Sequence, residues 1–351
     1  MRLGLLGCGS VACWIHLPAL RRIPGAVLAA AADPDPAARA RAGRVAGVPT
    51  YERADQLLER EDIGAVLICA PTHLHAELAI AAAEAGKHFY LEKPLATTAL
   101  DAGRVLDATA RAGVIGVIGF NRRLHPLYQQ ARELLRGGCI GRIRAAQSAF
   151  CEPTTLDVLP QWKRHRATGG GVLLDLASHH VDQLRWLLGD EVGSISASLR
   201  SELSEDDTAR IELSMESGIE VQGFFSFRSG LADYLECIGE LGTLRIDRYS
   251  GSLTLRVGRR LGYGVRRRWV GASPAGAAWR LARLLRPSFD PSYRRSLRAF
   301  VELVHGAPSR TASLLDGLRS LEAVLAAEDS ARRGEAIRPD RRSAGATCAH
   351  C

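Results

Sequence analysis

The sequence predicts an α/β unit followed by an α+β unit. Up to about residue 120, short apolar runs alternate with helical patterns, as in a parallel, doubly wound sheet. From about residue 190, apolar runs are separated by short turns, which is typical of a large open, mostly antiparallel sheet. The length of 351 residues, 46% of them hydrophobic and 24% charged, suits two domains of ordinary size. We therefore expect domains at residues 1–120 and 121–337, and a polar tail at 338–351.

A glycine-rich turn follows the first apolar run, residues 3–6. Gly7-Cys8-Gly9-Ser10-Val11-Ala12 has the G-x-G-x-x-A order and leads into a helical pattern, the context of a dinucleotide-binding unit. The glycines permit a tight turn and a close backbone approach to a pyrophosphate, and the helix N-terminus adds N–H donors. A plain strand-to-helix turn is the alternative.

The second apolar run, residues 27–32, ends in Asp33. A Rossmann domain places an acid here to accept the ribose hydroxyls, and a carboxylate repels a 2′-phosphate. No cation occurs in Pro34-Asp35-Pro36 to offset that repulsion. The sequence thus favours NAD over NADP, with a helix-capping role for Asp33 as the alternative.

The alternation continues through the rest of the first 120 residues. Helices are expected near residues 36–46, 55–59, 71–86 and 101–112, and strands near 50–51, 65–70, 89–91 and 114–119. Lys93 follows one of these strands, and ligands of parallel sheets bind beyond the carboxyl ends of the strands. Pro94 biases Lys93 to an extended backbone, and the bond between them can be cis. A surface lysine before a turn is the alternative.

The second half contains a glycine box, Gly169–Asp182. Its residues Asp175, His179 and Asp182 recur at i, i+4 and i+7, so on a regular helix they project from one face. His179 titrates near neutrality and is a natural base, and Asp175 can hold its tautomer. The glycines would let substrate and nicotinamide approach the backbone. A solvated stripe is the alternative, and Asp182 is expected to be a supporting or substrate-contacting residue.

A metal site at this box is not expected. His180 points about 100° away from its neighbour on a helix, and Lys93 would repel a cation.

A loop before the box, residues 150–167, is expected to select the substrate. The run Trp162-Lys163-Arg164-His165-Arg166 supplies five positions able to bind hydroxyls, carboxylates or phosphates, and Trp162 could stack on a sugar face. This basic composition hints at an anionic substrate, such as a nucleotide-linked sugar. A polar loop with solvated arginines is the alternative.

These motifs together resemble the glucose–fructose oxidoreductase/inositol dehydrogenase (Gfo/Idh/MocA) family over about residues 1–255 and again in the last helix. The resemblance rests on the glycine turn, Asp33 and the glycine box, with Pro71-Thr72-His73-Leu74-His75, Ala85-Gly86-Lys87-His88, Glu92-Lys93-Pro94 and Phe120-Asn121-Arg122-Arg123. It implies Lys93, Asp175 and His179 as catalytic residues, with Asn121 near substrate or nicotinamide. It also implies a homo-oligomer formed through the second sheet. The expected cofactor-binding residues are Gly7, Gly9, Ser10, Val11, Asp33, Pro71, Thr72, His75, Glu92, Lys93 and Asn121. The expected substrate-binding residues are Lys93, Asn121, Trp162, Arg164, Arg166, Asp175 and His179.

The net charge of +8 belongs to one segment. Residues 256–298 contain twelve arginines and one acid, whereas the rest of the chain has 34 basic and 37 acidic residues. Residues 275–286 form a basic amphipathic pattern that we expect to dock on the protein itself, with contact to a membrane surface as the alternative. No matching fold or aromatic platform indicates nucleic-acid binding.

The remaining features indicate a cytoplasmic protein. No apolar run approaches the roughly 20 residues of a membrane span, and too few residues precede Gly7-Cys8 for a lipoprotein signal. Eight scattered cysteines are typical of reduced thiols, and the spacing of Cys348 and Cys351 alone is weak evidence for zinc.

Three hypotheses for the function follow. The first is an NAD-dependent oxidoreductase acting on a secondary alcohol or ketone of a sugar or cyclitol derivative, with His179 as base and Lys93 and Asp175 assisting. The second is a redox-neutral enzyme in which tightly held NAD removes and returns a hydride during elimination or epimerisation. The third is a non-catalytic regulatory protein that binds NAD and a sugar.

Overall fold

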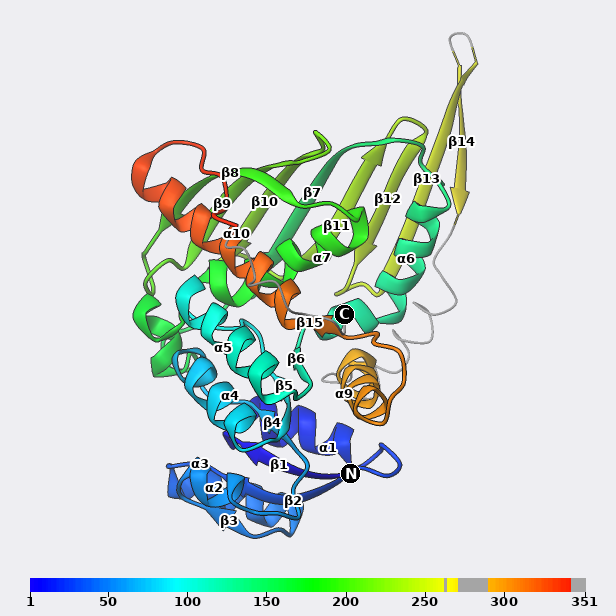
Figure 1. Cartoon of the computed structure of the whole chain (residues 1–351). Coiled ribbons are helices and arrows are strands. Elements are labelled where there is room, and N and C mark those ends of the chain that lie inside the picture. Colours follow the sequence, from blue (N-terminus) through cyan, green and yellow to red (C-terminus); the bar gives the residue numbers. More distant parts are fainter. Residues whose placement is uncertain (262–263, 271–289, 342–351) are drawn as a thin grey trace.

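The computed structural model describes residues 1–261, 264–270 and 290–341, with side chains described for residues 1–258 and 290–341. Within these residues the chain forms two sheets, one of seven strands and one of eight (Figure 1). The expected order, an α/β unit followed by an α+β unit with a large open sheet, is confirmed.

The first sheet is parallel except for one edge strand, and its order is β15-β6-β5-β4-β1-β2-β3. The central strands are buried on both faces, because helices cover the two sides of a doubly wound sheet. Their apolar runs of alanine, valine, leucine and isoleucine reflect this burial. The strand bounds are β1 Arg2–Leu6, β2 Val27–Ala32, β3 Thr50–Tyr51, β4 Ala65–Ile68, β5 His88–Leu91, β6 Gly116–Ile118 and β15 Ala312–Ser313.

The helices of this unit match the sequence expectation within a few residues, apart from the first and the one after β4. The first begins as a π-helical turn, η1, and continues as the short α1, and a 3₁₀ turn, η2, precedes α4. Asp35 caps α2 by accepting from the backbone of Ala37, and Gly47 ends it with a φ of 70°. The bounds are η1 Ala12–His16, α1 Leu17–Leu20, α2 Pro36–Ala46, α3 Ala54–Leu58, η2 Thr72–Leu74, α4 His75–Glu84 and α5 Ala99–Ala112.

The second sheet has the order β14-β13-β12-β11-β7-β10-β9-β8 and is antiparallel except where β7 and β10 run parallel. Buried and exposed residues alternate along β9 and β10, as expected where one face is covered and the other is open. The β13–β14 hairpin extends beyond the body of the molecule (Figure 1). The bounds are β7 Ile143–Cys151, β8 Val192–Arg200, β9 Thr208–Met215, β10 Glu220–Ser226, β11 Ala232–Gly239, β12 Gly242–Asp247, β13 Ser252–Leu261 and β14 Gly264–Val270.

Helices cover the inner face of this sheet, and several short turns lead into them. A π-helical turn, η6, precedes α7 inside the glycine box, so the box is not the regular helix that the i, i+4, i+7 spacing assumed. The bounds are η3 Asn121–Leu124, α6 Pro126–Arg136, η4 Gln161–Arg164, η5 Arg166–Thr168, η6 Leu173–Ala177 and α7 Ser178–Leu188.

After residue 290 the chain returns to the first sheet. Helix α9, Pro291–Val304, packs on α1 through Leu297, Phe300 and Val301, which join the core beneath β1 and β4. Strand β15 pairs antiparallel with β6, and α10, Leu314–Arg333, then contacts both α5 and β8 (Figure 1). The segment expected to belong wholly to the second domain, 121–337, therefore contributes a helix and a strand to the first.

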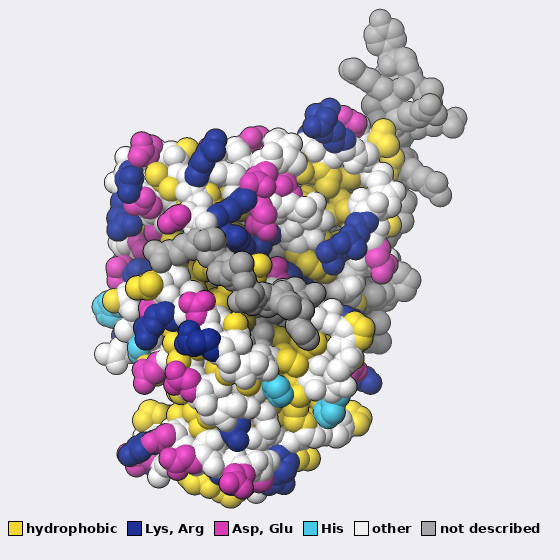
Figure 2. Space-filling view, in the orientation of Figure 1, with side chains coloured by type: hydrophobic (Ala, Val, Ile, Leu, Met, Phe, Trp, Pro, Cys, Tyr) yellow, Lys and Arg dark blue, Asp and Glu magenta, His cyan; other side chains and the backbone are white. Residues whose placement is uncertain are grey.

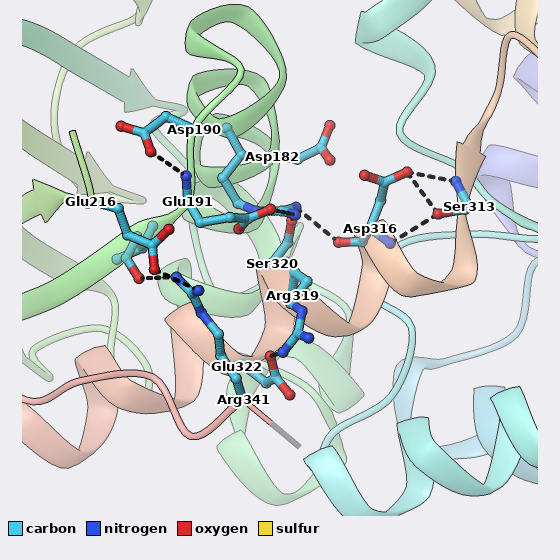
Figure 3. A network of polar contacts seen from close by, with 12 residues as sticks. Asp182, Asp190, Glu191, Glu216, Ser313, Asp316, Arg319, Ser320, Glu322 and Arg341 are labelled. Atoms are coloured by element: carbon cyan, nitrogen blue, oxygen red, sulfur yellow. Dashed lines mark hydrogen bonds and ion pairs between the residues drawn. The ribbon is translucent and has the colours of Figure 1, made fainter. Parts of the chain in front are cut away.

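A polar network fixes α10 against α7 and the start of β8 (Figure 3). The buried Arg185 guanidinium donates to both carboxylate oxygens of Glu191, to the hydroxyl of Ser320 and to the carbonyl of Asp316. Asp316 in turn caps α10 by its exchange of hydrogen bonds with Ser313. The network thus links Ser313, in strand β15 of the first sheet, to α7 and the start of β8.

Among the described residues, no helix combines the length and the hydropathy that a membrane span requires. On the face shown in Figure 2, lysine and arginine side chains alternate with acidic ones instead of forming one broad basic surface. Residues 275–286, Cys348 and Cys351, which carried the membrane-surface and zinc alternatives, lie outside the described residues.

Candidate active site

One carboxylate lies between two lysines where the first unit meets the second. Lys93, which follows β5, donates from Nζ to Oδ1 of Asp175 at 2.9 Å and to its carbonyl oxygen at 2.7 Å. Lys163, from η4, donates to Oδ2 of Asp175 at 2.6 Å. The side chains of Lys93 and Asp175 are only 12% and 14% exposed. The contact therefore joins the end of a parallel strand to the glycine box, and it brings together two of the residues that the family resemblance implied for catalysis.

The two ammonium groups decide the protonation of Asp175. Burial alone would raise the pKa of this carboxyl, but the charges of Lys163 and Lys93 and their hydrogen bonds hold it well below its usual range. Asp175 is therefore an anion at neutral pH. It holds the Lys93 ammonium in a fixed position through two hydrogen bonds.

The turn that carries Lys93 contacts the buried ring of His75. The Lys93–Pro94 peptide bond is cis. The buried ring of His75 lies with Nδ1 2.6 Å from the carbonyl oxygen of Pro94 and Nε2 2.9 Å from that of Ala70. Burial lowers the pKa of His75. His75, expected among the cofactor-binding residues, thus ties the end of β4 to the Lys93 turn.

His179 lies at the start of α7 in an aromatic pocket. Its ring is 6.3 Å from the ring of Phe120 and 6.4 Å from that of Phe150. Nδ1 is buried and has no hydrogen-bond partner among the described residues. Burial first, and then the positive charges of Lys93 and Arg122, lower the pKa of His179 well below its usual value. The imidazole is therefore neutral and able to accept a proton.

The expectation that Asp175 orients the His179 ring does not fit the structure. Both carboxylate oxygens of Asp175 are bound by lysines. The π-helical turn before α7 changes the register between the two residues.

The glycines of the box also differ from expectation, because they pack against protein groups. A Cβ on Gly169 would lie 2.3 Å from Cβ of Thr72, and one on Gly170 would lie 2.3 Å from the carbonyl oxygen of Lys163. Gly169 also has a φ of 94°. These two glycines therefore allow the box to pack on η2, which follows β4, and on the segment that carries Lys163.

The glycine-rich turn has the conformation that the motif predicts. Gly7 has a φ of 89°, and a Cβ there would lie 2.7 Å from the backbone of Cys69 and Ala70. Gly9 is exposed and faces open space, as do Ser10 and Val11 at the start of the helical segment. This exposed backbone suits a pyrophosphate.

Asp33 lies beside this turn at the end of β2. Its carboxylate accepts from the backbone N–H of Cys8 at 2.6 Å and of Asp35 at 2.9 Å. A carboxylate has about four acceptor sites, so lone pairs remain for two ribose hydroxyls. The residues present therefore fit an NAD adenosine and pyrophosphate. Arg39 and Arg41, which the sequence argument overlooked, donate to backbone carbonyls of this region.

Three other expected cofactor contacts point into the protein. Glu92 lies 2.6 Å from Nε2 of the buried His16. Asn121 is buried and donates to the hydroxyl of Ser292 on α9. Thr72 is buried against Gly169. These side chains hold the walls of the site, whereas Pro71 beside Thr72 stays partly exposed.

The arginines expected to bind substrate are also engaged with protein. Arg164 donates to the carbonyls of Leu159 and Leu156. Arg166 forms two hydrogen bonds with Glu328 on α10 and donates to a further backbone carbonyl. Trp162 remains partly exposed, with the Lys163 ammonium 5.4 Å from its ring centroid. Of the expected loop residues, Trp162, Lys163 and His165 keep exposed surface that a ligand could reach.

Asp182 does not join the site. It is buried and forms a two-bond ion pair with Arg123, at 2.9 and 2.5 Å. Of the two expectations for Asp182, a substrate contact does not fit its burial, whereas a supporting role fits its ion pair with Arg123. His180 likewise points inward, to Asp233 and Ser148. Among the described residues, no group of three or more His, Cys, Asp or Glu side chains could hold a metal ion.

Sequence reasoning identified one cation of the site without its partner and another without a role. Lys163 was among the five positions of the expected substrate loop, but its pairing with Asp175 could be known only once the loop was folded. Arg122 lies over the ring of Phe150 at 4.3 Å, in an ion pair with Asp233. The short motif Phe120-Asn121-Arg122-Arg123 was the only signal for it.

Comparison with known proteins agrees with this architecture. A family model described as "Oxidoreductase family, NAD-binding Rossmann fold" matches residues 1–154, and one described as "GFO/IDH/MocA C-terminal domain" matches residues 128–245. Inositol 2-dehydrogenase 2 of Saccharopolyspora erythraea is 31% identical over 330 residues, 91% of this chain and 90% of that protein.

Two Thermotoga maritima proteins are also similar. Myo-inositol 2-dehydrogenase is 31% identical over 226 residues, which are 62% of this chain and 66% of that protein. The crystal structure of a probable dehydrogenase superposes with a TM-score of 0.78 at 27% identity, covering 97% of this chain and 99% of the other. The chain therefore belongs to the GFO/IDH/MocA family of oxidoreductases, with an NAD-binding Rossmann domain followed by the family's C-terminal domain.

Proposed function

We propose that the protein is an NAD-dependent oxidoreductase that transfers hydride between nicotinamide and a secondary alcohol or ketone of a neutral sugar or cyclitol. The single observation that carries this proposal is the contact between Lys93 and Asp175 beside a neutral, buried His179. It combines a fixed cation with a proton acceptor where the two units meet. Oxidation of a carbinol needs both groups.

The proposed roles follow from charge and proton balance. The imidazole of His179 takes the proton of the substrate hydroxyl. The hydride leaves the carbon that carries this hydroxyl. The Lys93 ammonium stabilises the negative charge that develops on the substrate oxygen, because it is fixed before the reaction begins. Asp175 is a positioning residue for Lys93 and Lys163. NAD, when bound, supplies the hydride acceptor.

The substrate class follows from which side chains remain available. Arg164 and Arg166, the residues that hinted at an anion, are bound to backbone carbonyls and to Glu328. The partly exposed Trp162 and the lysine pair suit the apolar face and the hydroxyls of a polyol. Two similar proteins are named as dehydrogenases of inositol, a neutral cyclitol.

The test is a panel of inositols, neutral sugars and nucleotide-linked sugars, with NADH followed by absorbance. We expect NADH formation with a neutral member of the panel and its loss in Lys93→Met and in His179→Asn. NAD that stays bound through gel filtration, with substrate converted but no net NADH, would favour the redox-neutral hypothesis instead. If no member of the panel reacted with either NAD or NADH, and if Lys93→Met and His179→Asn left the biological output unchanged, the regulatory hypothesis would be favoured.

We also propose that the chain forms a homo-oligomer through the open face of β8, β9 and β10. Phe224 on this face is 39% exposed, beside a hollow of about 570 Å³ lined by Arg200 and Arg210. Light scattering of the intact chain tests this. A monomer at micromolar concentration, or an oligomer unaffected by Phe224→Glu, would contradict it.

A further inference from the structure

A second hollow, of about 670 Å³, shares no residue with the candidate active site. Its walls come from η3, α6, α7, α9 and the loop after α9. These segments are far apart in sequence. The hollow therefore forms only when α9 and the loop after it come to lie beside η3, α6 and α7. Its volume lies in the range of small-molecule sites.

The hollow is strongly basic. Arg132, Arg295, Arg298 and Arg310 line it, and Glu302 is its only acidic residue among those described. Glu302 is shared between Arg298, at 3.0 Å, and Arg310. Arg295 forms no hydrogen bond or ion pair with any described residue. Four guanidinium groups therefore face one carboxylate, which leaves an excess of three positive charges.

Arg132 is the most confined of these cations. Its guanidinium lies over the ring of Trp186 at 4.2 Å, and Nε is buried without a partner among the described residues. Burial, and then the charges of Arg136 and Arg123, lower the pKa of Arg132. A buried donor without an acceptor is unfavourable, so a ligand oxygen that reached Nε would satisfy it.

We propose that this hollow binds a phosphorylated small molecule, with the phosphate oxygens held by Arg132, Arg295 and Arg298. Guanidinium groups match the geometry of phosphate oxygens through paired hydrogen bonds. A phosphate monoester carries about 1.5–2 negative charges at neutral pH, and a pyrophosphate carries more, so either would offset much of the excess. A single carboxylate would offset only one charge.

The experiment uses the intact chain saturated with NAD, so that the glycine-rich turn is already filled. Inorganic pyrophosphate is the probe, titrated by calorimetry at about 0.15 M salt, with orthophosphate and sulfate as separate arms. The test variant is Arg295→Ala/Arg298→Ala. Both side chains are exposed and Glu302 keeps Arg310 as a partner, so we expect the fold to stay intact. The matched control is Arg332→Ala, an exposed arginine on α10.

We expect pyrophosphate to bind with a dissociation constant of about 1 mM or below. The double variant should weaken it at least about tenfold, and the control should leave it unchanged. Tighter binding of pyrophosphate than of sulfate would support recognition of phosphate charge. The proposal is overturned by no binding to the NAD-saturated protein, by equal affinity in the double variant, or by an equal loss in Arg332→Ala.

Discussion

The Nζ atom of Lys163 lies 2.6 Å from Oδ2 of Asp175, opposite the Lys93 ammonium at Oδ1. The two lysines come from different units, so the carboxylate joins the parallel sheet to the loop before the glycine box. Their contacts are unequal. Lys93 holds both the side chain and the carbonyl oxygen of Asp175, whereas Lys163 holds one carboxylate oxygen and is more exposed, at 26% against 12%.

This inequality predicts different losses for the two lysines. Lys163→Met should raise the pKa of Asp175, because one ammonium is removed, yet Lys93 remains in place. We expect kcat to fall about tenfold or less. Lys93→Met removes the cation proposed to face the substrate oxygen and should lower kcat by about 10²–10⁴. Steady-state kinetics on an active substrate compares the two. Equal losses, or a larger loss in Lys163→Met, would contradict these roles.

The pH dependence of alcohol oxidation tests His179 as the proton acceptor. Its pKa is lowered well below 6.5 by burial and by neighbouring cations, so the ring is neutral throughout the neutral range. We expect kcat/KM to lose activity to His179 protonation only below pH 6.5. His179→Asn should remove most of the activity and this acid limb with it. An unchanged limb in the residual activity of the variant would assign the titration to another group.

Stability should fall on mild acidification because several histidines are buried in the neutral form. The pKa of His125 is lowered from 6.5 to about 4 by burial. The unfolded chain therefore binds the proton first, and the free energy of unfolding decreases as pH falls from 6.5 toward 4. His125→Asn keeps an acceptor for the cap of α6, where the imidazole now accepts from Leu127. Urea titrations at pH 7 and pH 5 should show a loss that is smaller by about 2 kcal/mol in the variant. An identical loss in both proteins would exclude His125 as a contributor.

Two glycines of the nucleotide turn form a matched pair of variants. Gly7→Ala puts a Cβ 2.7 Å from the backbone of Cys69 and Ala70 at a φ of 89°, so the melting temperature should fall. A Cβ at Gly9 meets nothing within 4 Å, so Gly9→Ala should leave the melting temperature unchanged. If NAD approaches Gly9, the same variant should weaken NAD binding about tenfold or more. Unchanged NAD affinity in a stable Gly9→Ala protein would contradict the proposed pyrophosphate site.

The sequence predicts this fold well wherever a local signal exists. The strands and helices of the Rossmann unit and the turns of the second sheet follow from periodicity and glycine positions, and most bounds agree within about two residues. Lys93 and Asp175 each lie at a motif that the family resemblance identified, but their direct contact was not predicted. The nucleotide turn and Asp33 also follow directly from spacing.

Other parts of the site depend on pairings that no local pattern records. The π-helical turn at Leu173–Ala177 shifts Asp182 away from Asp175, and helical spacing alone cannot reveal such a turn. Arg166 has the composition of a substrate-binding residue, but its partner, Glu328, is 162 residues away. Likewise, the return of β15 to β6 pairs segments separated by most of the chain.

The buried pair of Arg123 and Asp182 distinguishes structural from catalytic carboxylates in the glycine box. Asp182→Ala would leave the Arg123 guanidinium, 9% exposed, with only Asp316 as counter-ion. Removing one partner of a buried pair costs about 3–5 kcal/mol, so the free energy of unfolding should fall by that amount. Asp329→Ala on α10, which removes the acid of surface pairs with Arg332 and Arg333, should cost about 1 kcal/mol or less. Because Asp182 touches neither lysine, the folded fraction of Asp182→Ala should keep kcat within about threefold of the native value, in contrast to Asp175→Ala. Urea denaturation and kinetics on the same preparations separate the two effects. A stable but inactive Asp182→Ala protein would return this carboxylate to the active site.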